Sequence, residues 1–446
     1  VLALPGGIIN STVWISALTG GHTLIPLSPE ATAQEKARIG RQYQPNILIV
    51  EQAADARDFN RPDATVITRQ LCELLIQQAS HTPDATHEHM PASQGSVILH
   101  TSGSTGKPKG VQLQEAQIAW AAEHISASHH LSPQDRGLTV LPFFHVNAPV
   151  VSLCASLIAG STTVIAHRFS RHHFWEWIER YQITWASIVP TILAIMLETE
   201  KPAFLPGPLR FVRTASAPLP ASQMKAFESK FGLPVIETYG LSEAASQVTA
   251  NPVPPGIHKA GSVGLPVGVS LRICRPLSEK GDEPWVDIEP GTTGEICVCG
   301  YSVIQGYLGN ADERSFQDGW FRTGDIGHLD QDGYLFITGR LREVIIRGGE
   351  NIAPREIEEV LLTHPLVRDT AVVGRPDPIY GEVVVAYVVT EGKGGSETQR
   401  RLHLYAAERL SPAKVPVDYV IVSTLPRTTS GKVARQVLRE QELQHG

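Results

Sequence analysis

The chain has 446 residues, of which 42% are hydrophobic and 19% are charged, a balance typical of a globular protein with two or three domains. Its formal net charge of −7 argues against nucleic acid or an anionic membrane as a general partner, because such partners attract an excess of lysine and arginine. Its five scattered cysteines indicate a reduced protein of the cytoplasm rather than a disulfide-bonded one.

The N-terminal region lacks the basic and apolar segments of a secretory signal. Because residues 12–27 already have the character of a segment well inside a first domain, we expect several elements to precede Val1. The uncharged stretch 146–166 is nearly long enough to span a bilayer, but a proline, a glycine and the polar run 161–163 interrupt it. We therefore predict a buried helix followed by a buried strand there, and no integral membrane span.

Strand-like and helical segments alternate along the first half of the chain. The spacing of apolar residues predicts strands over 47–51, 96–101, 138–142, 184–188, 209–214 and 235–238, and helices over 116–128, 174–181, 191–198 and 222–231. This alternation predicts parallel sheets with helices on both faces, an α/β architecture. Ligands of such sheets bind at the carboxyl ends of the strands, which directs attention to the loops that follow those ends.

The pattern changes in the second half of the chain. From about Gly261, short strands and turns predict a β-rich subdomain, and after Arg340 a compact α+β pattern follows. That pattern comprises helices over 354–363 and 401–410 and strands over 370–374 and 382–389. We place a domain boundary at 339–343, which gives a large domain over 1–340 and a small C-terminal domain over 341–446.

The most informative segment is the loop 101–110 (TSGSTGKPKG), directly after the predicted strand 96–101. Glycine permits the positive φ angles with which successive N–H groups converge on an anion, and lysines and hydroxyls add charge and donors. The loop is not a Walker loop, because Lys107 is followed by Pro108. We predict a phosphate-binding loop between a strand and a helix. The predicted contacts are Thr101, Ser102, Gly103, Ser104, Thr105, Gly106, Lys107 and Lys109.

This loop resembles the signature of the adenylate-forming superfamily, which includes acyl-CoA synthetases, luciferases and the adenylation domains of peptide synthetases. Further segments match the superfamily in order and approximate spacing: PFFH (142–145), TASAPL (214–219), ETYGLSE (237–243), WFRTGD (320–325), RGGENIAP (347–354) and LPRTTSGKVAR (425–435). The resemblance implies an α/β fold with a large N-terminal domain of doubly wound sheets and a β-rich subdomain, plus a small mobile α+β C-terminal domain.

The resemblance implies a nucleotide site assembled from several of these segments. Tyr239 would stack on adenine, Asp325 would accept hydrogen bonds from the ribose hydroxyls, and Arg340 would contact the nucleotide. Ser242 stands where threonine is more usual and keeps the hydroxyl. The other cofactor-binding positions implied are Ser216, Ala217, Pro218, Glu237, Thr238 and Gly240, together with Arg347, Gly348 and Gly349 of the mobile C-terminal loop.

The resemblance also implies the catalytic residues. Lys432 matches the catalytic lysine of the superfamily, Glu243 and Thr105 would bind Mg²⁺ through oxygen, and His145 would gate the acyl pocket. Arg342 falls at the hinge position, where aspartate or lysine is more familiar, and it would permit the same rotation. The acid pocket implied comprises His145, Asn147, Thr191, Thr214, Ala215, Ala244 and Ser246.

The implied activity is ATP-dependent conversion of a carboxylic acid to an acyl-adenylate, followed by transfer to a thiol, with Mg²⁺ and coenzyme A. Rotation about Arg342 would withdraw Lys432 after the first step and bring the loop of Gly348 and Gly349 to the acyl site. The segments HKAGSVGLPVG (258–268) and RGGENIAPREIE place the chain nearest the branch of oxalate–CoA ligase and medium-chain or aromatic acyl-CoA synthetases.

Several alternatives stay open at this stage. An α-amino acid is disfavoured because residues 143–145 offer no carboxylate for its ammonium, which leaves oxalate or another small polar acid, an aryl acid or a fatty acid. Free coenzyme A is favoured as the acceptor over a separate carrier protein. A nucleotide binder without ligase activity and a luciferase-type oxidation are lesser alternatives, and the protein would be a monomer or a homodimer.

Overall fold

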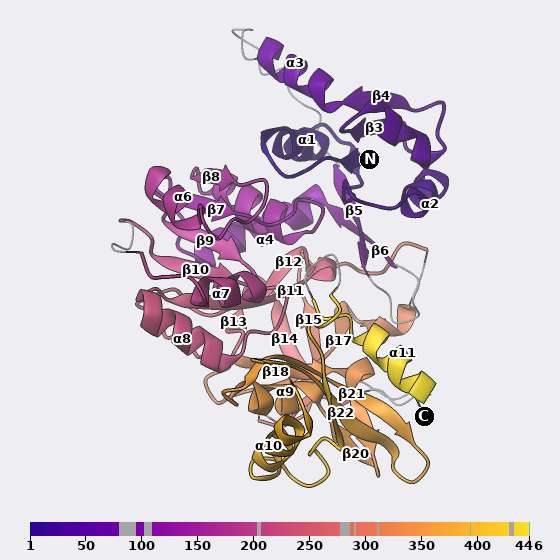
Figure 1. The fold of residues 1–446 in the computed structure, drawn as a ribbon. Helices are drawn as coiled ribbons and strands as arrows, with labels where there is room; N and C mark the ends of the chain where they lie inside the picture. Colours follow the sequence, from indigo (N-terminus) through magenta and orange to yellow (C-terminus); the bar gives the residue numbers. More distant parts are fainter. Residues whose placement is uncertain are drawn as a thin grey trace.

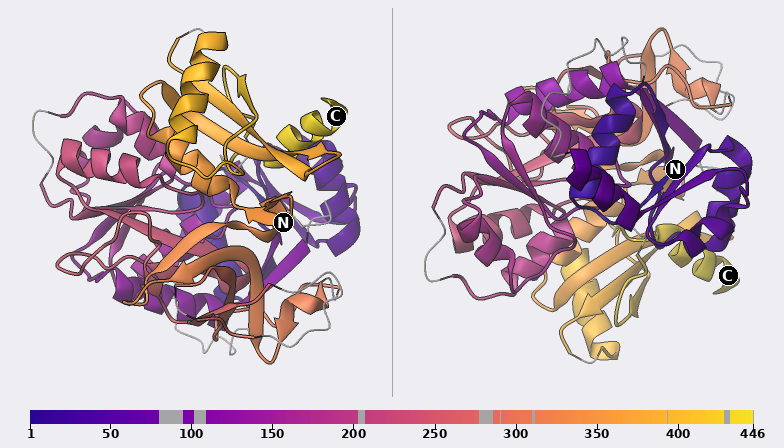
Figure 2. Two further views of the ribbon diagram at one scale, coloured as in Figure 1. Left: turned by 90° about the horizontal axis from the view of Figure 1, so that it is seen from below. Right: turned by 90° about the horizontal axis from the view of Figure 1, so that it is seen from above.

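The computed structural model describes residues 1–79, 95–101, 109–202, 207–276, 286–289, 291–309, 312–392, 394–427 and 432–445. The predicted phosphate contacts from Ser102 to Lys107, the metal ligand Thr105 among them, lie outside the described residues. Figure 1 shows the chain running from the small N-terminal sheets through a central α/β body to a C-terminal α+β lobe. Both views of Figure 2 show that lobe, coloured orange to yellow, projecting from one side of the larger body.

Two three-stranded sheets lie at the N-terminal end of the molecule (Figure 1). The first is parallel and contains β1 (Leu2–Ala3), β3 (Ile47–Val50) and β4 (Thr65–Thr68); the second contains β2 (Thr23–Leu24), β5 (Ser96–Thr101) and β6 (Lys109–Gln114). The accompanying helices are α1 (Ile8–Thr19), α2 (Ala33–Tyr43), the 3₁₀ segment η1 (Ala53–Phe59) and α3 (Arg69–Ala79).

The position of the phosphate loop corrects one prediction. β5 and β6 pair antiparallel, with Thr101 opposite Lys109, so the loop connects two strands rather than a strand and a helix. The reason is the sequence of β6, in which the buried Val111 and Leu113 alternate with the more exposed Gln112 and Gln114 as in a strand, whereas helical spacing begins only with α4 (Glu115–Ser128). The first residue of the motif therefore ends one strand and Lys109 begins the next.

A seven-stranded sheet forms the centre of the large domain, in the order β13-β12-β11-β10-β9-β7-β8. Its parallel strands are β7 (Arg136–Thr139), β8 (Thr162–Ile165), β9 (Trp185–Ile188), β10 (Phe211–Thr214) and β11 (Val235–Leu241), and β12 (Ser246–Ala250) and β13 (Leu265–Pro266) follow antiparallel. The helices are α4, the π-helix η2 (Asn147–Cys154), α5 (Ala155–Ile158), α6 (Phe174–Arg180), α7 (Pro190–Leu197) and α8 (Ala221–Phe231), and the 3₁₀ turn η3 (Ser242–Ala244) links β11 to β12.

The central strands are buried on both faces, which explains their continuous apolar character. Trp185 and Phe211 on the neighbouring strands β9 and β10 are fully buried, with ring centroids 6.1 Å apart. The stretch 146–166 contains the predicted helix and strand, as η2, α5 and β8. β8 lies at the edge of the sheet and is half-exposed, so the prediction that this strand is buried was wrong.

An antiparallel sheet forms the β-rich subdomain. It contains β14 (Ser270–Cys274), β15 (Gly294–Cys299), β17 (Trp320–Leu329) and β16 (Phe316–Gln317) in that order, with β18 (Leu335–Arg340) also paired to β17; the 3₁₀ turn η4 (Glu313–Ser315) precedes β16. Asp318 and Gly319 have φ angles of 51° and 78°. They form a tight turn between β16 and β17, as their sequence predicts.

The C-terminal segment has a sheet and a core of its own. The sheet contains β20 (Glu350–Ile352), β19 (Ile345–Arg347), β22 (Gly381–Thr390) and β21 (Val367–Asp377), with β23 (Asp418–Ile421) beside β22; the helices are α9 (Pro354–Leu362), α10 (Ser396–Ala407) and α11 (Arg435–His445). The apolar face of α9 places Ile357 and Leu361 in this core. The 3₁₀ turn η5 (Leu341–Glu343) joins β18 of the large domain to β19.

Candidate active site

Tyr239, Asp325 and Arg340 form one connected group, in which Tyr239 and Asp325 are buried and Arg340 is partly exposed. The hydroxyl of Tyr239 donates to Asp325 Oδ2 at 2.7 Å, and Arg340 Nε lies 2.7 Å from Asp325 Oδ1. Asp325 in β17 faces Arg340 in β18 across the antiparallel ladder, so the sheet register brings the pair together. Burial and the charge of Asp325 raise the pKa of Tyr239. A carboxylate has about four acceptor positions, so Asp325 keeps the capacity to bind ribose hydroxyls.

Glu243 extends from the turn η3, directly after β11. It is buried, and the hydroxyl of Tyr307 donates to its Oε1 atom at 2.8 Å. No ion pair within the described ranges includes Glu243, and burial raises its pKa. A buried carboxylate with one oxygen still available and no cationic partner fits a hard cation such as Mg²⁺. The described residues hold no group of three histidine, cysteine, aspartate or glutamate side chains that could bind a metal ion.

The close approach of β11 and β12 fixes the position of Glu243. A Cβ atom on Gly240 would lie 1.7 Å from the carbonyl oxygen of Ser246, so only glycine fits there. Ala245 and Ser246 have positive φ angles of 51° and 94°, which close the turn. The backbone thereby holds the Glu243 carboxylate at the carboxyl end of β11.

Lys109 binds protein groups beside Glu243. It forms an ion pair with Asp312, and its ammonium nitrogen lies 4.7 Å from the centroid of the Tyr307 ring. Because Tyr307 also binds Glu243, Lys109 and Glu243 share one aromatic neighbour. The sequence analysis missed Tyr307 and Asp312, since neither belongs to a recognisable motif and both lie far along the chain from Lys109.

The loop after β10 carries the predicted adenine-side residues. Ser216 has a φ angle of 75°, and Asn147 Nδ2 donates to its hydroxyl oxygen at 3.1 Å. Thr214 is fully buried, and its Oγ1 atom has no hydrogen-bond partner. Glu237 lies opposite Thr214 in the sheet and accepts from the backbone N–H of Leu219 at 3.3 Å.

Glu237 differs from a surface carboxylate in its ionisation. It is 2% exposed, and its Oε2 atom has no partner. Burial raises the pKa of Glu237 to about 7. Its hydrogen bond from the backbone N–H of Leu219 indicates that Glu237 supports the loop 215–219.

His145 and Lys432 meet at the acid side of the site. The Nε2 atom of His145 is buried without a partner, and the ring lies 4.6 Å from that of Phe144. Burial, followed by the positive charge of Lys432, lowers the pKa of His145 to about 4, so the ring is neutral at pH 7. The charge of Lys432 therefore reaches the acid pocket from the C-terminal domain.

Lys432 is exposed as a residue, but the protein around its ammonium group lowers its pKa by desolvation. The nearby cation Arg340 lowers this pKa further, and the negative charges of Asp325 and Glu243 raise it. The structure thus brings the charge of Lys432 close to Glu243 and Asp325, although Lys432 lies more than 100 residues from either of them in the sequence.

The predicted hinge is tied to the segment that carries Lys432. Arg439 Nη1 donates to the carbonyl oxygen of Arg342 at 2.7 Å, and Arg435 pairs with Glu343 at 3.3 Å. Arg435 also pairs with Glu358 of α9 at 2.6 Å. The hinge residue Arg342 and the following Glu343 therefore contact α11, which begins three residues after Lys432.

The predicted thiol-side loop lies elsewhere. Arg347 Nη1 donates to the carbonyl oxygen of Pro412 at 3.2 Å. The backbone N–H of Gly348 donates to the carbonyl oxygen of Tyr380 at 2.8 Å. Gly348 and Gly349 have φ angles of 59° and 87°, which favour glycine. These contacts hold the loop within the C-terminal domain, and Figure 1 shows β20 at the end of the lobe remote from β11 and β12.

The remaining predicted residues surround the same strand ends. Thr238 is buried and donates from its hydroxyl to the carbonyl oxygen of Thr214 at 3.3 Å. The others are Ala215, Ala244 and Ser246, which are buried; Thr101, Thr191, Ala217 and Ser242, which are half-buried; and Pro218, which is exposed.

The sequence analysis also missed Arg213. This residue precedes Thr214 in β10, is 1% exposed and donates to Asn147 of the predicted acid pocket. No motif points to it, because an arginine inside an apolar strand is visible only as a break in the pattern FVRT.

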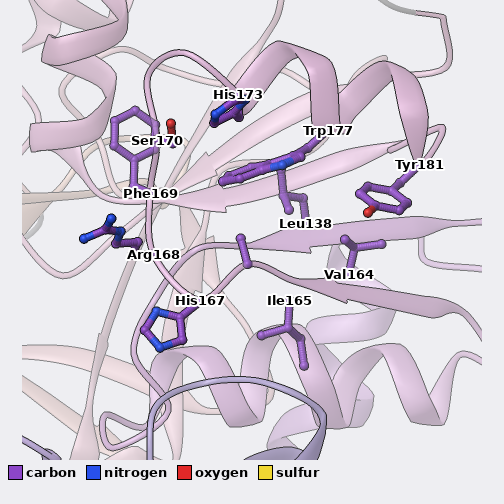
Figure 3. Close-up of a pocket in the computed structure, with 11 residues that line it drawn as sticks. Leu138, Val164, Ile165, His167, Arg168, Phe169, Ser170, His173, Trp177 and Tyr181 are labelled. Carbon is purple, nitrogen blue, oxygen red and sulfur yellow. The ribbon is translucent and has the colours of Figure 1, made fainter.

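A hollow of about 820 Å³ opens at the edge of the central sheet (Figure 3). Figure 3 shows Trp177 and Tyr181 of the α6 region on one side of it and Val164 of β8 on the other, while Ile165 points away from them. None of the described residues predicted for the site lines this hollow. Along the described ranges, no helix combines the length and the apolar character that a membrane crossing requires.

Two family models match the chain. The model described as AMP-binding enzyme matches residues 11–308, and the one described as AMP-binding enzyme C-terminal domain matches residues 356–432.

Curated proteins give two informative similarities. The chain is 43% identical over 342 residues to the sulfoacetate–CoA ligase of Cupriavidus necator, a match that covers 76% of this chain and 65% of that protein, just under two thirds. It is 35% identical over 465 residues to the oxalate–CoA ligase of Arabidopsis thaliana, which covers 99% of this chain and 88% of that protein.

Solved structures extend the similarity to the three-dimensional arrangement. ATP-bound MatB from Rhodopseudomonas palustris matches with a TM-score of 0.88 at 28% identity, over 99% of this chain and 88% of that one. The apo form of MatB covers the same shares with a TM-score of 0.78 at 27% identity. The O-succinylbenzoate coenzyme A synthetase of Bacillus subtilis, solved with ATP and magnesium, matches at 0.81 and 30% identity, over 99% and 88%. These likenesses confirm the predicted α/β class with a large N-terminal and a smaller C-terminal domain.

Proposed function

The chain belongs to the AMP-binding enzyme family, which confirms the predicted resemblance to adenylate-forming enzymes, and from that membership we propose that it is an acyl-CoA ligase. It activates a carboxylic acid with ATP, releases pyrophosphate and transfers the acyl group to coenzyme A. The observation that carries this proposal is that Lys432 lies near enough to Asp325 and Glu243 for their charges to act on it, beside the hydrogen bond between Tyr239 and Asp325.

In the first half-reaction, an oxygen of the acid attacks the α-phosphorus of ATP, and the bond to pyrophosphate breaks. Both reactants are anionic, so the site must offset their repulsion. Tyr239 and Asp325 hold the nucleoside, and Lys432 neutralises charge that develops at the α-phosphate. Glu243 would hold Mg²⁺, which when bound neutralises the phosphates and orients the leaving group.

His145 acts as a neutral wall of the acid pocket. Its pKa of about 4 means that it carries no charge at pH 7, so it competes with neither Lys432 nor the metal for the anionic groups. The unpartnered Nε2 atom of His145 and the Oγ1 atom of Thr214 are available to polar atoms of a bound acyl-adenylate.

In the second half-reaction, the thiol of coenzyme A attacks the mixed anhydride and AMP leaves. We propose that the C-terminal domain rotates about Arg342 before this step, withdraws Lys432 and brings Gly348 and Gly349 toward the acyl carbon. The contacts of Arg435 and Arg439 with the hinge support this coupling, because they tie the lysine segment to the residues that would turn.

The relatives favour free coenzyme A over a carrier protein as the acceptor, because the two named above are both CoA ligases. They act on short polar acids, and we propose a short polar acid for this chain also. We place the enzyme in the cytoplasm, as a monomer or a homodimer, where its five cysteines, all free in the structure, stay reduced.

The proposal is tested by measuring acid-dependent release of pyrophosphate with ATP and Mg²⁺. The panel of acids spans oxalate, sulfoacetate, benzoate and straight-chain acids of increasing length, each with and without coenzyme A. We expect release with at least one short polar acid, and a thioester product when coenzyme A is present. Release with none of the acids would contradict the proposal.

A further inference from the structure

Arg213 is a buried cation without a counter-ion. It lies in β10, is 1% exposed and takes part in no ion pair within the described residues. Its Nε atom has no hydrogen-bond partner. Burial lowers the pKa of Arg213 to about 9, so the side chain is still charged at pH 7. An unpaired buried charge is strongly unfavourable in a folded chain, which calls for an explanation beyond packing.

The neighbours of Arg213 are all neutral acceptors. Its Nη1 atom donates to Asn147 Oδ1 at 2.8 Å and to Ser187 Oγ at 3.3 Å, and its Nη2 atom donates to Gln247 Oε1 at 3.4 Å. The nearest titratable ring, that of His129, is neutral, because burial and the charge of Arg213 lower its pKa to about 3. The positive charge is therefore solvated by amides and a hydroxyl but not cancelled.

These contacts fix the direction of a hydrogen-bond relay. A guanidinium only donates, so Asn147 must present its oxygen to Arg213. The amide nitrogen of Asn147 then faces Ser216 and donates to its hydroxyl oxygen at 3.1 Å. With that oxygen accepting, the O–H of Ser216 is free to donate to a further acceptor, and successive bonds in such a chain strengthen one another.

The relay ends at the mouth of the site. Ser216 is half-buried, in contrast to Arg213 and Asn147, and its φ angle of 75° turns the loop out from the end of β10. A non-glycine residue with this conformation is strained and needs support, which the bond from Asn147 gives. Ser216 thus presents a donor, backed by a full positive charge, next to the predicted acid pocket.

We propose that Arg213, acting through Asn147 and Ser216, makes the enzyme prefer acids that carry a second anionic group, a carboxylate or a sulfonate, besides the carboxylate that is activated. The second group accepts the hydrogen bond of the Ser216 hydroxyl and compensates the buried charge. The inference rests on the proposed ligase function and names its substrate class. Arg213 is a positioning residue in this account, because it acts through the two residues in front of it.

The test compares kcat/KM for pairs of acids of similar size, with pyrophosphate release as the measurement. The dianionic acids are malonate and sulfoacetate, and the monoanionic acids are propionate and butyrate. For the wild type we expect a preference of about 30-fold or more for the dianions, since hydrogen bonds to charged groups contribute a difference of this order. Arg213→Met should remove that preference through a higher KM for dianions, with kcat/KM for monoanions changed less than about threefold.

Two further variants separate the charge from the shape of the side chain. Asn147→Asp keeps the size of residue 147 but cancels the charge of Arg213 and removes the donor to Ser216, so it should favour monoanions. Arg213→Lys keeps the charge and should restore part of the preference. Arg210→Met is the matched control: it removes a cation three residues earlier, which pairs with Asp135, and should leave the preference unchanged.

Measurements of thermal stability show whether a variant has lost its substrate preference or its fold. Replacing an unpaired buried arginine with methionine is neutral or stabilising for the fold, so the melting temperature of Arg213→Met should equal or exceed that of the wild type. Loss of activity by the same factor for all four acids in Arg213→Met, or no preference for dianions in the wild type, would overturn the inference and leave the ligase function intact. Failure of the wild type with every acid would refute the ligase function itself.

Discussion

The two lobes of the site are built in different ways. In the large domain, Tyr239, Asp325, Glu243 and Tyr307 are buried and joined by hydrogen bonds of 2.7 and 2.8 Å. Lys432, in the C-terminal domain, is exposed and acts on the same groups through its charge. The comparison shows a hydrogen-bonded nucleotide platform and, opposite it, an exposed lysine. The proposed withdrawal of Lys432 between the two half-reactions would require this difference.

Removing the positive charge of Lys432 should have the largest effect on activity. In Lys432→Ala, the site loses the cation that faces the α-phosphate, so acid-dependent pyrophosphate release should fall by about 1,000-fold, the order expected for loss of a group that stabilises transition-state charge. The measurement is a steady-state pyrophosphate assay at saturating acid. Lys414→Ala, which removes an ion pair with Glu356 in the same domain, should retain nearly full activity; a similar loss in both variants would contradict the assignment.

Removing the buried carboxylate of the platform should have the next largest effect. Glu243→Gln keeps the shape and the acceptor for Tyr307 but removes the charge that would hold Mg²⁺, so pyrophosphate release should fall by about 100-fold and require more Mg²⁺. The assay is a titration of activity against Mg²⁺ concentration. An unchanged Mg²⁺ dependence would show that the metal is held elsewhere. Glu391→Gln, which breaks a surface pair with Arg368, serves as the control.

Removing the hydroxyl that supports this carboxylate should have a smaller effect. Tyr307→Phe leaves the ring over Lys109 and deletes the hydrogen bond to Glu243, so activity should fall by about tenfold, in proportion to one hydrogen bond to a charged group. Tyr334→Phe deletes a hydrogen bond of similar length, from the Tyr334 hydroxyl to the carbonyl oxygen of Ile257, and should retain full activity. Equal losses in the two variants would mean that Tyr307 supports only the fold.

The pH dependence of the unfolding free energy should report the protonation of the buried Glu237. Burial raises the folded-state pKa of this carboxyl to about 7, above its ordinary value of 4.5, so the folded protein binds an extra proton between these pH values. Its contribution to the unfolding free energy therefore decreases as the pH rises through that window, by at most about 1.4 kcal/mol per pH unit. Glu237→Gln should flatten this dependence, as measured by urea unfolding at pH 5 and pH 8. Parallel pH profiles for the two proteins would contradict a buried protonated carboxyl.

The sequence predicts those parts of the site that lie within continuous motifs. Tyr239, Glu243 and Asp325 stand in segments whose order and spacing are specific. Tyr239 and Glu243 lie at the carboxyl end of β11, where such sheets bind ligands, and a hydrogen bond joins Tyr239 to Asp325 of β17. The alternation of strands and helices likewise predicts the central sheet, including β9 and β10, to within a few residues.

Residues that act through tertiary contacts escape sequence reasoning. Tyr307 lies 64 residues from Glu243, and Asp312 lies 203 residues from Lys109, so no local pattern joins either pair. Arg213 is hidden in an apolar strand. The strand–loop–helix prediction for the phosphate loop failed because the segment after it forms β6, paired with β5, before the helix begins. Pairing of two strands across a loop is a tertiary event that propensity alone does not determine.

In the proposed mechanism the C-terminal domain serves the two half-reactions in turn with different residues, and the most direct measurement separates those reactions in two variants. Acyl-AMP formation from acid and ATP, and thioester formation from supplied acyl-AMP and coenzyme A, are each followed in a single turnover. Lys432→Ala should lose the first and keep the second within about fivefold, while Gly349→Val, which strains a φ angle of 87° in the thiol-side loop, should do the reverse. Equal loss of both reactions in either variant would contradict the account.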